Sequence, residues 1–110
     1  MRVPDLILGE FEQLVLLALH RQGRDGYGVS ICQDITDRTG RDVSLGAVYK
    51  TLERLETKGL VASHIGEPTA ERGGRRKKHY RLLGKGQRAL QASLLAIRRM
   101  TEGLGAEFER

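Results

Sequence analysis

The residues of this chain that could take part in chemistry are mainly cations, and two of them follow a helical spacing. In the helix predicted over Ser44–Lys58, Lys50 and Arg54 lie four residues apart, so both project from one side. Such side chains reach the phosphates or the guanine edges of DNA. The simpler alternative is a solvated helix face, on which Glu53 offsets part of the positive charge.

Small and aromatic residues on the same helix extend this interpretation. Gly46 and Ala47, near its start, would let the end of the helix approach base edges closely. Tyr49 could stack against a sugar or donate its hydroxyl to a phosphate. The outer face of this helix is therefore the first candidate DNA contact.

A basic run follows this helix. Two strands are expected over Leu60–Ile65 and about Lys78–Leu83, and the run RGGRRKKHYR (Arg72–Arg81) lies at the tip of the hairpin and continues into the second strand. A charged run is usually a solvated loop, but its place between two strands favours contact with a minor groove and with phosphates. The candidate residues of the tip are Arg75, Arg76, Lys77 and Lys78.

The division of charge along the chain supports a polyanionic partner. The net charge is +5 over 110 residues, and residues 41–88 hold twelve Lys or Arg against five Asp or Glu. Residues 1–40 are net negative and residues 89–110 are balanced. The excess positive charge therefore lies in the helix and hairpin described above, as expected for binding to nucleic acid.

Other chemistry is not indicated. Cys32, His20, His64 and His79 lack the paired spacing of metal ligands, and no nucleophile is accompanied by a base and an orienting acid. We therefore expect no enzyme activity, no metal and no cofactor. The single cysteine excludes an internal disulfide and fits a reducing cytoplasm, and the longest dense apolar run, Leu14–Leu19, is too short to cross a membrane.

Two further helices must position these residues. Apolar periodicity predicts helices over about Glu10–Gln22 and Tyr27–Thr39, and Arg41–Val43 is expected to be extended and to form a short first strand. Ser44 is a plausible N-cap for the next helix, because its hydroxyl can accept from an unpaired backbone N–H. The expected buried stripe of that helix is Leu45, Val48, Leu52 and Leu55.

The last predicted helix runs from about Gly86 to Phe108 and carries a heptad seam. Apolar residues recur at alternating spacings of four and three, interrupted only by a threonine. Since the first three helices fill their own core, a second copy of the chain is the simplest partner for this seam. The seam residues are Leu90, Leu94, Ile97, Thr101, Leu104 and Phe108.

These elements predict a mainly α chain with a small β-hairpin (α+β). We expect a winged helix-turn-helix DNA-binding domain over residues 1–83 and a C-terminal dimerisation helix over residues 84–110. The motifs resemble the PadR family of bacterial transcriptional regulators. The resemblance rests on DGYGVSICQDI (Asp25–Ile35), SLGAVYKTLERLETKGLV (Ser44–Val61) and GGRRKKHYRLLGKGQRAL (Gly73–Leu90).

The resemblance implies a cytoplasmic, homodimeric repressor that binds a pseudo-palindromic operator in double-stranded DNA. It implies DNA contacts at Tyr27 and Ser44 in addition to the outer face of the helix and the tip. A small-molecule effector at the dimer interface is compatible with it. The tryptophans between which some short members hold flat hydrophobic drugs are absent, so that mechanism does not carry over.

An alternative of a different class is a winged-helix adaptor that binds proteins and not DNA. Such modules usually have an acidic or apolar recognition face. The positive charge of residues 41–88 argues against this alternative.

Overall fold

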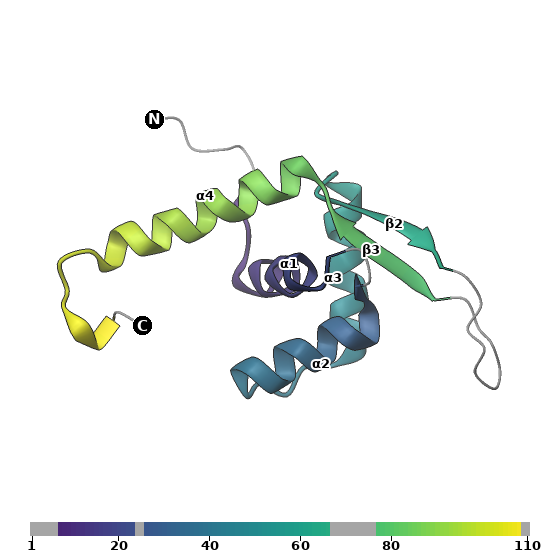
Figure 1. The fold of residues 1–110 in the computed structure, drawn as a ribbon, viewed down its shortest axis with the longest axis horizontal. Coiled ribbons are helices and arrows are strands. Elements are labelled where there is room, and N and C mark those ends of the chain that lie inside the picture. The colour runs from purple at the N-terminus through teal and green to yellow at the C-terminus, as the bar shows by residue number, and fades with distance from the viewer. Residues whose placement is uncertain (1–6, 24–25, 67–76, 109–110) are drawn as a thin grey trace.

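The computed structural model describes residues 7–23, 26–66 and 77–108, which form helices with a small sheet packed on one side of them (Figure 1). The elements in chain order are α1 (Glu10–Gln22), β1 (Gly26–Tyr27), α2 (Gly28–Thr39), α3 (Leu45–Thr57), β2 (Val61–Ile65), β3 (Lys78–Leu82), α4 (Gly84–Thr101) and the short 3-10 helix η1 (Ala106–Phe108). This is the α+β winged helix-turn-helix with an additional C-terminal helix that the sequence predicts.

Helix α1 lies at the centre of the core and has the predicted bounds. Its start is fixed by Glu12, whose Oε1 accepts the backbone N–H of Gly9 at 2.9 Å. Val15, Leu16 and Leu19 are fully buried, so α1 is enclosed on much of its circumference. The core around it is completed by α2, α3, the sheet and the first part of α4. Its remaining large members are Leu8, Ile31, Ile35, Val48, Leu52, Leu55, Leu60, Val61, Tyr80 and Leu90.

The sheet has the strand order β1-β3-β2 and is antiparallel throughout. The expectation of a short strand at Arg41–Val43 is wrong, because residues 40–44 have no regular structure and the short strand is β1. Gly26 explains its position. A Cβ on Gly26 would lie 2.6 Å from Cδ1 of Leu19, so a glycine lets the chain pass this close to α1 and pair with Tyr80.

Helix α3 buries a slightly different stripe from the one expected. Leu45 is 39% exposed, whereas Thr51 is 2% exposed and joins Val48, Leu52 and Leu55 on the inner face. Leu45 is the first residue of the helix and lies on the margin of this face. Helix α2 likewise begins one residue later than predicted, because Tyr27 belongs to β1.

Helix α4 begins at Gly84, earlier than predicted, and ends at Thr101, well before the predicted Phe108. Gly103 and Gly105 have positive φ angles of 81° and 92°, a conformation that interrupts a helix. Leu104 and Phe108 therefore lie beyond α4 and do not continue its seam. Leu90 is 4% exposed and packs in the core of its own chain, which leaves it little surface for a partner.

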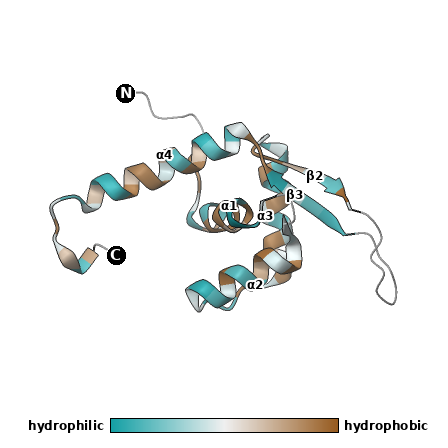
Figure 2. Cartoon of the chain, in the orientation of Figure 1, coloured by the Kyte–Doolittle hydropathy of each residue, from teal (hydrophilic) through white to brown (hydrophobic). Residues whose placement is uncertain are grey.

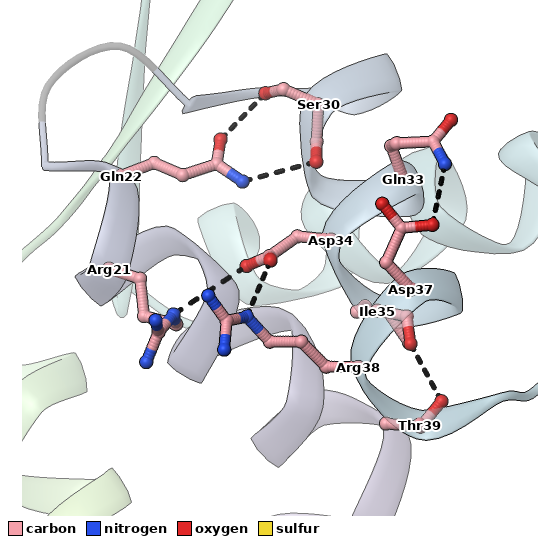
Figure 3. Close-up of polar contacts among 9 residues, drawn as sticks. All are labelled: Arg21, Gln22, Ser30, Gln33, Asp34, Ile35, Asp37, Arg38 and Thr39. Atoms are coloured by element: carbon pink, nitrogen blue, oxygen red, sulfur yellow. Dashed lines mark hydrogen bonds and ion pairs between the residues drawn. The ribbon is translucent and has the colours of Figure 1, made fainter.

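Helices α1 and α2 are also joined by polar contacts (Figure 3). The Asp34 carboxylate pairs with Arg38 at 2.7 Å and lies 4.0 Å from Arg21 of α1. Gln22 of α1 accepts from the hydroxyl of Ser30 at 2.6 Å and donates to its carbonyl at 3.1 Å. These contacts fix the start of α2 relative to α1.

Candidate DNA-binding surface

The outer face of α3 is accessible over its whole length. Ser44 caps the helix as predicted, because its Oγ accepts the N–H of Ala47 at 3.1 Å. A Cβ on Gly46 would meet no atom within 4 Å, so the first turn offers an unobstructed approach. Lys50 and Arg54 are exposed on the same face. The structure thus brings together the α3 candidates predicted from the sequence.

Tyr49 lies at the junction of α3 with α2. Its side chain is packed over Gly28, and a Cβ on that glycine would lie 2.3 Å from the Tyr49 Cζ. Tyr49 is nevertheless 38% exposed. One part of its side chain therefore packs between α3 and α2, while the rest faces solvent. Sequence reasoning predicted the exposed role and missed the packing role.

The C-terminal end of α3 is held by a half-buried ion pair. Lys58 Nζ donates to Glu12 Oε2 at 2.8 Å, and Lys85 of α4 donates to the Lys58 carbonyl at 3.3 Å. Burial raises the pKa of the Glu12 carboxyl, but the hydrogen bonds from Lys58 and Gly9 and the nearby positive charges outweigh it. The net pKa of Glu12 is lowered, so this carboxylate is charged and ties α1 to α3.

Lys77, just before β3, and Lys78, its first residue, lie on opposite faces of the sheet, because side chains alternate along an extended chain. Lys78 faces α3: its Nζ is 4.0 Å from Glu56 Oε1 and 5.6 Å from the centre of the Tyr80 ring. Burial raises the pKa of the Tyr80 hydroxyl, so it is neutral beneath Lys78. The predicted contacts Arg75 and Arg76 lie outside the described residues.

The outer face of the sheet carries an aromatic row in which Tyr27, a DNA contact implied by the family resemblance, is joined by His79 and His64. His79 is paired in register with Tyr27 of β1 and with His64 of β2. The two histidine rings are stacked with centroids 5.5 Å apart, and the Tyr27 ring meets His79 edge-on at 5.6 Å. Lys77 Nζ lies 4.4 Å above the centre of the Tyr27 ring. In the sequence, Lys77 and His79 are two residues apart, and this spacing could have predicted that both lie on one face of the sheet.

Helix α4 leaves the body after its second turn and presents apolar residues to solvent. Figure 1 shows its second half projecting beyond α1, and Figure 2 shows apolar turns among polar ones along it. Leu94, Ile97 and Met100 are 39%, 60% and 78% exposed. This is a continuous apolar edge of the kind that subunit interfaces cover.

Metal sites and membrane spans receive no support from the described part of the chain. It contains no cluster of three potential metal ligands among His, Cys, Asp and Glu. Cys32 is half-buried, and its thiol lies 3.3 Å from the carbonyl oxygen of Val43. Within the same residues, no helix is long and apolar enough to cross a membrane.

The sequence of the chain is similar to that of known proteins. The profile of the transcriptional regulator PadR-like family matches residues 15–92, which include α2, α3, the hairpin and the start of α4. An uncharacterised protein from Lysinibacillus sphaericus is 30% identical over 85 residues, covering 76% of this chain and 73% of that protein.

Solved structures share the fold. A PadR family transcription regulator from Clostridium difficile is 26% identical, with a TM-score of 0.71 over 86% of this chain and 93% of that one. A PadR family transcriptional regulator from Eggerthella lenta is 26% identical, with a TM-score of 0.66 over 91% and 87%. Bacillus subtilis PadR, solved in complex with operator DNA, is 22% identical and has a TM-score of 0.65 over 77% and 47%.

Proposed function

Because the chain belongs to the PadR-like family of transcriptional regulators, we propose that it is a homodimeric repressor that binds a pseudo-palindromic operator in DNA. The observation that carries the proposal is the outer face of α3, where Gly46, Lys50 and Arg54 are all accessible beside a basic hairpin. Residues 41–88, which include both elements, carry the excess positive charge of the chain. Bacillus subtilis PadR, whose fold the chain shares, was solved with operator DNA.

In this proposal α3 enters the major groove and the hairpin follows the backbone. Lys50 and Arg54 read base edges or phosphates, and Ser44, Gly46, Ala47 and Tyr49 lie at the end that approaches the groove. Two copies of α3 would then occupy successive major grooves about 34 Å apart. The twofold symmetry of the protein would be matched by the near-palindrome of the operator.

The second copy is proposed to pack on the projecting half of α4. Leu94, Ile97 and Met100 form the exposed apolar edge there, with Leu104 and Phe108 exposed beyond the helix end. Thr101 lies between them at the end of α4. An effector that relieves binding stays a prediction of the family resemblance.

The test is selection of duplexes from a random pool with the full chain, followed by fluorescence anisotropy titration. DNA from upstream of its own gene serves as a second probe. Binding should weaken steeply with salt, with a logarithmic slope of about −0.9 for each phosphate that the protein neutralises. A protein-binding adaptor would show no duplex preferred over random DNA at about 0.15 M salt, and that result would refute the proposal. Repression itself is checked by placing the selected duplex before a reporter gene, whose expression the chain should lower.

A further inference from the structure

We infer that Tyr27 is a positioning residue: its ring holds the Lys77 ammonium at the base of the hairpin, ready for a DNA phosphate. The inference rests on the proposed DNA-binding function and deepens it. It replaces a direct contact between Tyr27 and DNA with an indirect one that acts through Lys77. The contact itself is a cation–π pair, with Lys77 Nζ 4.4 Å from the ring centre.

The Tyr27 ring is a fixed platform because its backbone is held on both sides. On the α2 side, the Tyr27 N–H donates to Ser30 Oγ at 3.1 Å, and Ser30 is bonded in turn to Gln22 of α1. On the sheet side, Tyr27 is in register with His79, and their rings meet edge-on. These contacts hold the Tyr27 backbone and one edge of its ring against the body of the protein.

Lys77, by contrast, belongs to a flexible residue type that loses much rotamer freedom when it is immobilised. A lysine held in advance loses less of that freedom when a phosphate binds. An ammonium group has three N–H donors, and one side of it against a ring leaves the other side able to donate to a phosphate oxygen. The ring thus favours the bound position of Lys77, and it carries no net negative charge that would neutralise the ammonium group.

Lys78 shows that the arrangement is particular to one lysine. It is the next residue and carries the same charge, but it lies on the other face of β3 near Glu56 and Tyr80. It has no contact of this kind with Tyr27. Lys78 is therefore a matched control for Lys77.

The experiment is a double-mutant cycle on the full chain, read by anisotropy with a fluorescent duplex selected as described above. Tyr27→Leu removes the ring face and should weaken binding about two- to fivefold, the factor expected of an exposed cation–π pair. In a Lys77→Gln background the same change should have almost no further effect. In a Lys78→Gln background it should keep its full effect. Tyr27→Phe retains the ring face and should recover most of the affinity that Tyr27→Leu removes.

Three results would overturn the inference. Equal losses in the Lys77→Gln and Lys78→Gln backgrounds would give Tyr27 a merely structural role. A loss in Tyr27→Phe as large as in Tyr27→Leu would mean that the hydroxyl contacts DNA directly. Without DNA, NMR should show the Lys77 ε-protons shifted upfield by the ring and restored in Tyr27→Leu, and absence of this shift would also refute the contact. If the natural chain binds no duplex, the proposed function fails first, which separates the two failures.

Discussion

The side chain of Tyr49 in α3 lies directly over Gly28 in α2, so that a methyl group on that glycine would sit 2.3 Å from the Tyr49 Cζ. Helix α3, which is proposed to enter the major groove, thus packs against α2 at a residue that has no side chain. The geometry of the helix-turn-helix depends on this contact.

We predict that Gly28→Ala destabilises the fold, because Tyr49 must leave its position or the two helices must move apart. Overpacking of this kind costs about 1–3 kcal/mol of the free energy of unfolding. Urea unfolding followed by circular dichroism measures it. Gly46→Ala is the matched control: its Cβ meets open space, and the change should stabilise α3 by up to about 1 kcal/mol. A Gly28→Ala chain as stable as the natural one would contradict the packing described.

Replacement of Lys50 by Ala should change which sequences are preferred, whereas loss of hairpin charge should weaken binding to all sequences alike. A lysine at a base edge contributes about 1–3 kcal/mol of discrimination at one position. Selection repeated with Lys50→Ala should relax the preference there. The Lys77→Gln chain should instead lose about one unit of salt slope without a change in preference. The interpretation of α3 would be wrong if the Lys50→Ala chain selected the same sequences.

The free energy of unfolding should depend on pH through the Glu12 carboxyl. The pKa of its carboxyl is lower in the folded chain than in the unfolded one, so its contribution is complete above the unfolded value and is lost as pH falls through the lower folded value. Glu12→Gln should cost on the order of 1–2 kcal/mol at pH 7, since a neutral amide accepts the hydrogen bonds from Gly9 and Lys58 more weakly than a carboxylate does. The difference from the natural chain should shrink below about pH 4.

Thermal unfolding across this pH range measures the effect. Glu10→Gln is the control, because the Glu10–Arg41 pair at 2.7 Å lies on the surface with both side chains substantially exposed. Such pairs contribute little. A pH dependence that is the same in the natural and Glu12→Gln chains would exclude Glu12 as its source.

Ile97→Glu should convert the proposed dimer to a monomer, because it places a charge in the apolar edge of α4. Leu95→Glu is the control: Leu95 is 40% exposed, but two residues of helix rotation place it on nearly the opposite side. Light scattering coupled to size-exclusion chromatography distinguishes the two states. A dimer that survives Ile97→Glu would place the interface elsewhere.

Features that depend on neighbouring residues could be predicted from the sequence, whereas features that depend on contacts between distant residues could not. The bounds of α1 follow from its own periodicity and from Gly23, and they agree with the structure. Strand β1 was missed because two residues carry no pattern, and only pairing with β3 reveals them. The length of α4 was overestimated because a heptad spacing can continue across Gly103, where the helix itself does not.

The candidate site shows the same division. The accessibility of Lys50 and Arg54 follows from helical spacing and is confirmed. The sequence shows Lys77 and Lys78 as members of one basic run. Only the register of β3 between its neighbours shows that one faces Tyr27 and the other faces Glu56.

The pairing of Gly26 with Tyr80 also has a kinetic consequence. It joins the first third of the chain to the last third, so the sheet cannot close until most of the chain has been synthesised. The helices are local and can form early, whereas strand pairing between distant parts of a chain forms slowly. During synthesis, the pairing of Tyr27 with His79 would therefore be among the last contacts of the fold to form.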